Sequence, residues 1–131
     1  MDDGALIERA LLGAELLIVG DAKGGDKLAL EIALAWDIIP AVYCADAKRF
    51  EQLQAQGIQC FLSTVTWQMD RVRAGPVRNA MMVRRAFEER AAGMDVCCSA
   101  FPGPKSVGTY DCMTQLKAAG FDVTVEPLKA A

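Results

Sequence analysis

The stretch Ala100-Phe-Pro-Gly-Pro-Lys-Ser-Val-Gly-Thr-Tyr-Asp-Cys-Met113 joins a predicted strand to a predicted helix through a loop of glycine and proline. Residues 94–101 form a largely apolar run, which is typical of a buried strand. Residues 109–119 carry apolar side chains at helical spacing, and Gly120 stands where a helix commonly ends. A strand, a glycine-rich loop and a helix can together present backbone N–H groups to an anion. An ordinary strand-to-helix turn has the same composition, so this loop alone leaves both interpretations open.

The composition is typical of one globular domain without a basic surface. The chain has 131 residues, of which 53% are hydrophobic and 24% charged. Its net charge of −3 argues against a general nucleic-acid-binding face, so nucleic acid is not an expected partner. Because the chain has no histidine, catalysis by a histidine base and metal binding by imidazole are both excluded.

The cysteines favour an intracellular protein. Five are present, at positions 44, 60, 97, 98 and 112, and none forms a C-x-x-C pair. An odd number without metal-ligand spacing fits reduced thiols, so we expect a cytoplasmic location and no metal or cofactor. The apolar runs are short and interrupted by charge, which predicts no signal peptide and no membrane partner.

Predicted strands and helices alternate along the whole chain, with no linker that would divide residues 1–131 into domains. Strands are expected at residues 15–19, 38–44, 58–65, 94–101 and 121–125, and helices at residues 4–12, 26–36, 46–57, 75–91 and 109–119. Such alternation indicates βαβ units, a parallel sheet and helices on both faces. Ligands of these sheets bind at the carboxyl ends of the strands.

Three segments are candidates for that edge, and the first is residues 20–26. Its candidate ligand-binding residues are Gly20, Asp21, Lys23, Gly24, Gly25 and Asp26. The spacing matches neither a P-loop nor a dinucleotide fingerprint. The alternative is a tight turn in which Asp26 simply begins the next helix.

The second candidate segment, residues 74–79, is expected to open a helix. It contributes Gly75, Arg78 and Asn79, and Arg78 is predicted in the first turn. A cation there opposes the helix dipole, which suggests that an anion lies beside it. The alternative is an ion pair between Arg78 and Asp21 or Asp111.

The third candidate segment, residues 102–109, offers two hydroxyls, an ammonium group and two glycine N–H groups that suit a phosphate. These groups belong to Gly103, Lys105, Ser106, Gly108 and Thr109. Asp111 follows, where it could hold ribose hydroxyls or act as an acid or base. The alternative role of Asp111 is that of an acidic residue at a helix N-terminus.

The three segments together resemble the SLOG superfamily, specifically its YspA/YpsA-related proteins, which are often found in phages and bacteria. The likeness rests on residues 19–29, 74–82 and 100–109, and it extends over most of the chain from about residue 3. It implies a Rossmann-like fold with a pocket for a nucleotide or a nucleotide-derived ligand.

The superfamily also includes the Lonely Guy phosphoribohydrolases, which cleave the base from nucleoside monophosphates. Those enzymes carry an arginine in a motif similar to that around Arg78, and a glutamate three residues after a Gly-Thr pair. Here Cys112 takes the glutamate's place and Asp111 precedes it, so Arg78 and Asp111 are the catalytic candidates. We therefore expect nucleotide binding, with a nucleotide hydrolase as the first alternative and a DNA-processing or structural partner as the second.

Family members usually begin with a strand that ends in a Gly-Ser-Arg-like motif and lies in the middle of the sheet. This chain shows no such strand before the helix near Asp3, so the first central strand is expected to be missing. The alternatives are a misplaced gene start, a truncated chain, or another segment in that place, for which residues 58–65 are the candidate. A sheet without its central strand leaves edges exposed, which predicts a homo-oligomer.

Overall fold

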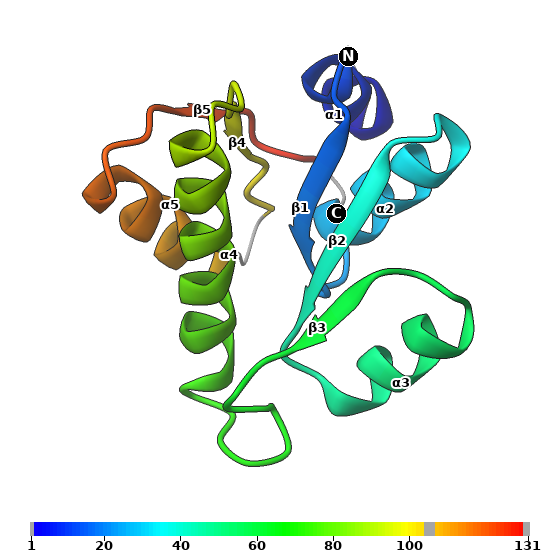
Figure 1. The fold of residues 1–131 in the computed structure, drawn as a ribbon, viewed down its shortest axis with the longest axis vertical. Coiled ribbons are helices and arrows are strands. Elements are labelled where there is room, and N and C mark those ends of the chain that lie inside the picture. Colours follow the sequence, from blue (N-terminus) through cyan, green and yellow to red (C-terminus); the bar gives the residue numbers. More distant parts are fainter. Residues whose placement is uncertain (1, 104–106, 130–131) are drawn as a thin grey trace.

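The computed structural model describes residues 2–103 and 107–129, in which helices and strands alternate (Figure 1). The helices are α1 (Asp3–Leu11), α2 (Gly25–Ala35), α3 (Ala47–Ala55), α4 (Ala74–Ala91) and α5 (Val107–Ala118). The strands are β1 (Leu16–Gly20), β2 (Ile39–Cys44), β3 (Cys60–Leu62), β4 (Cys98–Ala100) and β5 (Val123–Val125). The predicted Rossmann-like α/β class is therefore confirmed.

Every strand pairing is parallel, as predicted, but the strands lie in two sheets instead of one. One sheet has the order β1-β2-β3, and the other pairs β4 with β5. None of the backbone hydrogen bonds among the described residues joins β1 to β4. The break falls in the middle of the fold, where the SLOG resemblance predicts one more strand.

Both sheets have an open edge at this break. The Ile39 N–H donates to the Glu15 carbonyl (3.0 Å), so by the alternation of a parallel ladder Leu16 and Ile18 direct their backbone groups away from β2. The prediction that residues 58–65 fill this place is wrong. β3 pairs with the far side of β2, because Val42 donates its N–H to Gln59 across that outer edge.

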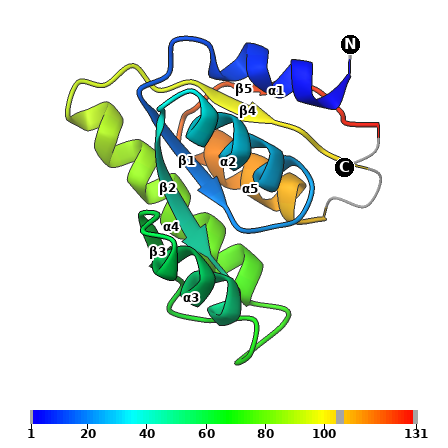
Figure 2. The same cartoon turned by 90° about the vertical axis from the view of Figure 1, so that its right-hand side faces the viewer.

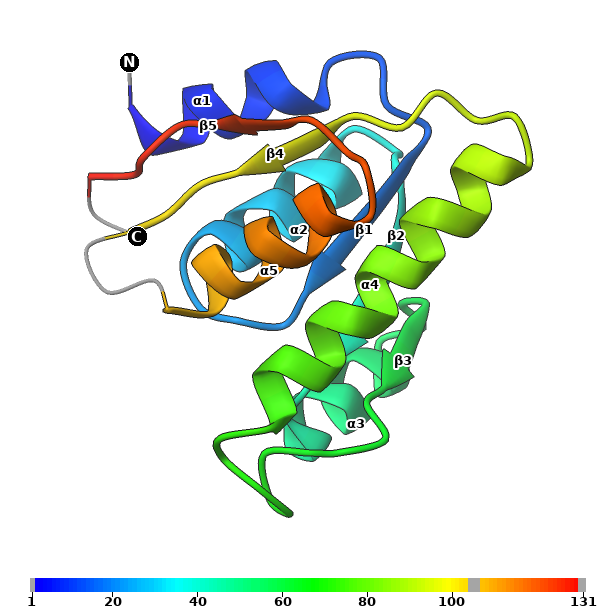
Figure 3. The same cartoon turned by 90° about the vertical axis from the view of Figure 1, so that its left-hand side faces the viewer.

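Helices cover both faces of the three-stranded sheet, as expected. α4 packs against β1 and β2 on one face with α5 beside it, whereas α2 and α3 pack on the other face (Figures 2 and 3). The main apolar core lies under α1, α2 and α3 and includes Ile7, Leu30, Val42 and Leu53. Phe101, which follows β4, packs against this core and attaches the small sheet to it.

Two helices begin earlier than the sequence predicts. The Asp70 carboxylate accepts the N–H groups of Val72 and Arg73 (3.0 and 3.1 Å), which stabilises a turn leading directly into α4 at Ala74. Arg78 therefore lies in the second turn of α4, and the expected first-turn position is wrong. Asp111 also lies beyond the first turn of α5, so its alternative role at a helix N-terminus is wrong too.

Within the part of the chain that the structure describes, no helix combines the length and the apolar character needed to cross a membrane.

Candidate functional site

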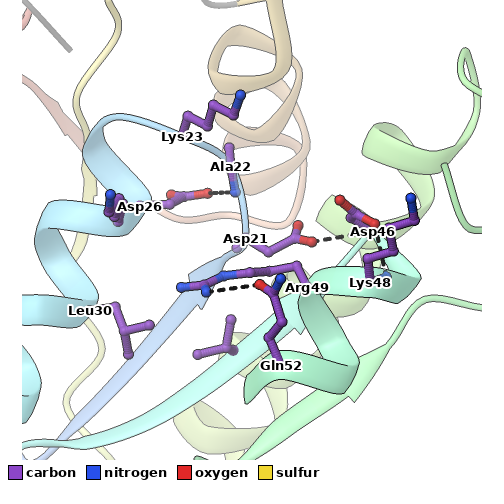
Figure 4. Close-up of a pocket in the computed structure, with 12 residues that line it drawn as sticks. Asp21, Ala22, Lys23, Asp26, Leu30, Asp46, Lys48, Arg49 and Gln52 are labelled. Atoms are coloured by element: carbon purple, nitrogen blue, oxygen red, sulfur yellow. Dashed lines mark hydrogen bonds between the residues drawn. The ribbon is translucent and has the colours of Figure 1, made fainter. Parts of the chain in front are cut away.

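A pocket of about 360 Å³ lies at the carboxyl ends of β1 and β2, between the start of α2 and the start of α3 (Figure 4). Its floor is apolar and its walls are charged. The lining residues are Gly20, Asp21, Ala22, Lys23, Asp26, Lys27, Leu30, Val42, Asp46, Lys48, Arg49 and Gln52. This is the edge at which the sequence predicts a ligand.

Four basic side chains surround the pocket. Lys23 and Lys27 come from the α2 side, and Lys48 and Arg49 come from α3. None of the four forms an ion pair with a described residue. In Figure 4, Arg49 reaches from α3 toward Leu30, and its Nη1 lies 3.4 Å from the Gln52 side-chain oxygen. The walls therefore offer several cationic groups that form no direct ion pair, and the charge of Lys48 also stabilises the ionised form of Asp46 in the same wall.

Asp21, by contrast, is fully engaged within the protein. Its buried carboxylate accepts the N–H groups of Ala45 (3.0 Å) and Asp46 (2.9 Å), which follow β2. It also accepts a hydrogen bond from Nη1 of Arg78 at 2.7 Å, and both side chains are less than 10% exposed. The negative charge of Asp21 is thus balanced by Arg78 and adds little to the charge of the pocket.

Asp26 lies beside this ion pair and is partly buried. Its Oδ2 accepts the Ala22 N–H at 3.0 Å, and burial raises the pKa of the Asp26 carboxyl, although the nearby Arg78 charge acts in the opposite direction. Gly20 allows this close arrangement. A Cβ at position 20 would lie 2.6 Å from Nη1 of Arg78 and 2.7 Å from Oδ2 of Asp26.

Asp46 forms the N-cap of α3 and shapes the opposite wall. Its Oδ1 accepts the Lys48 N–H (2.9 Å) and the Gln68 side-chain amide (2.8 Å). The hydrogen bond from Gln68 is the largest cause of a lowered pKa at Asp46, since it stabilises the ionised form. Gln68 also accepts the Ala47 N–H at 3.1 Å, so it fixes the start of α3 from the loop after β3.

Arg78 and Asn79 connect the three segments singled out in the sequence. The Arg78 Nε donates to the Asn79 side-chain oxygen at 2.9 Å. The Asn79 amide donates in turn to the Gly108 carbonyl (3.1 Å) and to Oδ2 of Asp111 (3.0 Å). Together with the Arg78–Asp21 pair, this network ties the 74–79 segment to both loops. Of the two interpretations of Arg78, the structure shows the ion pair with Asp21.

The predicted site residues divide into three groups. The pocket is lined by Gly20, Asp21, Lys23 and Asp26. Outside its lining lie Gly24, Gly25, Gly75, Arg78, Asn79, Gly103, Gly108, Thr109 and Asp111. Lys105 and Ser106 fall outside the described residues.

Sequence reasoning missed the α3 wall of the pocket, although a signal for it was present. Lys48, Arg49 and Gln52 directly follow a predicted strand and its N-cap, Asp46. That strand neighbours β1, so its carboxyl end reaches the same edge of the sheet. Among the described residues, no group of three or more cysteine, aspartate or glutamate side chains could hold a metal ion.

Comparisons with known proteins add little to this geometry. No family model and no solved structure matches the chain. The chain is 42% identical over 62 residues to the Gene 61 protein of Mycobacterium phage D29, a match that covers 47% of this chain and 43% of the phage protein. The match spans less than half of the phage protein, and the name of that protein states no activity.

Proposed function

We propose that the chain binds a nucleotide or nucleotide-derived ligand in the pocket between α2 and α3. The observation that carries this proposal is the set of four basic side chains, Lys23, Lys27, Lys48 and Arg49, which line one pocket of an acidic chain and form no ion pair with a described residue. Unpaired cations on facing walls favour an anion between them. The SLOG resemblance predicts the same class of ligand.

The shape and lining of the pocket favour a nucleotide over a bare anion. Leu30 and Val42 add apolar atoms to the lining, and the Asp46 carboxylate lies just after the end of β2, where ribose hydroxyls are commonly held in such folds. A volume of about 360 Å³ is at the lower end of the range for ligand pockets. This size favours one nucleotide over a dinucleotide.

The hydrolase alternative gains no support from the geometry around its catalytic candidates. Oδ2 of Asp111 accepts a hydrogen bond from the Asn79 amide of α4 (3.0 Å), which holds α4 against α5, and another from the Gln115 amide within α5 (2.8 Å). Burial raises the pKa of Cys112 to about 11, so its thiol is neutral near pH 7. Binding without hydrolysis is therefore the function that we put forward.

A thermal-shift screen tests the proposal. Mononucleotides, ADP-ribose, ribose 5-phosphate and inorganic phosphate are each added, because a ligand that binds only the folded state raises its stability. The affinity of each compound that binds is then measured by calorimetric titration into the parent protein and into the Lys48→Gln and Lys23→Gln variants. A charge-assisted hydrogen bond contributes about 1.5–3 kcal/mol, so each variant should bind about ten- to a hundredfold more weakly.

Lys117→Gln is the matched control, since Lys117 is an exposed lysine in the last turn of α5 and does not line the pocket. Its affinity should equal that of the parent. The proposal fails if no compound of the screen binds, or if Lys48→Gln and Lys23→Gln bind a hit as tightly as the control does.

We also propose that the chain forms a homo-oligomer through its open sheet edges. Leu16 and Ile18 belong to an apolar strand yet are only partly buried, and their backbone groups point away from β2. Pairing with another copy would satisfy those groups. Light scattering on a size-exclusion column at micromolar concentration should give at least twice the monomer mass, and a mass of 14.1 kDa would refute self-association.

A further inference from the structure

We propose that Asp26 recognises the ligand as a protonated carboxylic acid, and that its Oδ1–H donates a hydrogen bond to a phosphate oxygen. This inference rests on the proposed function and narrows the ligand to a phosphorylated nucleotide, as opposed to a neutral nucleoside.

The two carboxyl oxygens of Asp26 have different surroundings. Oδ2 is occupied, because it accepts the Ala22 N–H at 3.0 Å. No hydrogen bond within the described residues involves Oδ1. The described residues contain no buried side-chain oxygen without a partner, and Asp26 is not an exposed residue, so Oδ1 keeps some accessible surface in a residue that lines the pocket. One oxygen therefore anchors the side chain and the other is available to a ligand.

The groups around Asp26 act on its ionisation in both directions, because burial and Asp21 oppose the ionised form whereas the Arg78 charge and the Ala22 N–H favour it. Arg78 of α4 donates to Asp21 and to Asn79, and no ion pair joins it to Asp26. Asp21 adds a negative charge on the β1 side. On the α5 side Cys112 is a neutral thiol at pH 7, since its pKa is raised to about 11. Burial, the largest influence, raises the pKa of Asp26.

A phosphate in this pocket makes the protonated form still more favourable. Lys23 and Lys27 can balance the charge of the phosphate, but an ionised carboxylate in contact with its oxygens would repel them. If Asp26 is protonated in the complex, its Oδ1 is a donor instead of an acceptor, and a hydrogen bond to the phosphate replaces the repulsion. Above the pKa of free Asp26, binding must then take up one proton, so affinity falls by up to tenfold for each pH unit.

The test compares the parent with Asp26→Asn, using AMP and adenosine as probes. An asparagine amide can donate from nitrogen and accept the Ala22 N–H on oxygen at every pH, so it mimics the protonated acid permanently. Dissociation constants for AMP are measured from pH 5.5 to 8.5. We expect the ratio of parent to variant constants to rise toward high pH, by up to a hundredfold over two units. The ionisation of the phosphate of AMP cancels in this ratio.

Asp122→Asn is the matched control, because Asp122 is an exposed aspartate that does not line the pocket. It should follow the parent at every pH. A constant ratio between the parent and Asp26→Asn overturns the inference, and so does adenosine binding as tightly as AMP. If neither probe binds at any pH, the inference fails, whereas the proposed function fails only if no compound of the thermal-shift screen binds, which separates the two outcomes.

If Asp26→Asn does not fold, a second measurement on the parent protein tests the same inference. AMP binding to the parent is followed by calorimetry at pH 8 in two buffers of different ionisation enthalpy, which reveals proton uptake. At that pH the phosphate of AMP is fully ionised, since its second pKa is near 6. Uptake approaching one proton supports the inference, and no uptake refutes it.

Discussion

Replacing Arg78 with alanine should destabilise the fold strongly, because its guanidinium neutralises a buried carboxylate. The substitution removes the 2.7 Å hydrogen bond to Asp21 and the 2.9 Å hydrogen bond to Asn79. The Asp21 side chain, only 4% exposed, would be left without its cationic partner. Breaking a buried pair by removing one partner typically costs about 3–5 kcal/mol. The two backbone N–H groups that Asp21 retains place the expected cost toward the lower end.

This cost predicts a large change in the melting temperature. The unfolding entropy is about 2.1 cal/mol/K per residue, which for 131 residues amounts to about 0.28 kcal/mol/K. A loss of 3–5 kcal/mol therefore lowers the midpoint by about 11–18 °C. The free energy of unfolding is measured in urea by circular dichroism and by the fluorescence of Trp36 and Trp67, whose agreement checks that unfolding is two-state.

A double-mutant cycle separates the ion pair from general loss of packing. Arg78→Met keeps much of the side-chain volume, and Asp21→Asn removes the charge from the other partner. Asp21→Asn turns an amide nitrogen toward one of the two backbone N–H groups in either background, so that cost cancels in the cycle. The substitution should therefore cost less in Arg78→Met than in the parent, because only the parent loses the ion pair. If Arg78→Ala costs less than about 1 kcal/mol, or if the two substitutions are simply additive, the structural role assigned to Arg78 is wrong.

Three further outcomes follow from the local geometry. Gly20→Ala should lower the free energy of unfolding in urea by about 1–3 kcal/mol, because its Cβ would lie 2.6–2.7 Å from other side-chain atoms. Gly75→Ala is the contrasting variant: its Cβ meets nothing within 4 Å inside α4, so it should raise the free energy of unfolding by up to about 1 kcal/mol. Asp46→Ala should cost about 1 kcal/mol at pH 7 through loss of the α3 N-cap. This cost should vanish as the pH falls through the lowered pKa of Asp46, because a protonated carboxyl caps weakly. A thiol reagent at pH 8 should label exposed Cys97 in the folded protein and leave Cys44, whose buried thiol has a pKa raised to about 12, unlabelled until denaturant is added.

The order and type of the elements could be predicted from the sequence because they depend on neighbours along the chain. The apolar run at residues 15–19 became β1 within one residue, and Asp46 was correctly expected to cap a helix. α4 begins one residue before its expected start, because that start depends on a side-chain contact. Asp70 accepts the N–H groups of the two residues just before Ala74, and a contact of this kind cannot be predicted from the spacing of apolar residues.

One half of the candidate site was also visible in the sequence. The glycines and charged residues of the 20–26 segment, which directly follow a predicted strand, indicated a candidate site. The other wall, with Lys48 and Arg49, looked like the start of an ordinary surface helix. It faces Lys23 only because β2 pairs with β1 in parallel, which brings the two carboxyl ends to one edge.

The role of Arg78 depended most on the tertiary structure. Its residue type and its glycine-proline neighbours were compatible with a ligand phosphate or with an internal carboxylate, and nothing local favours either. α4 packs against β1 and brings Arg78 beside Asp21, which lies 57 positions earlier. The energy of a charge depends on which opposite charge lies within a few ångströms of it, and for residues so far apart in sequence only the packing of the folded chain sets that distance.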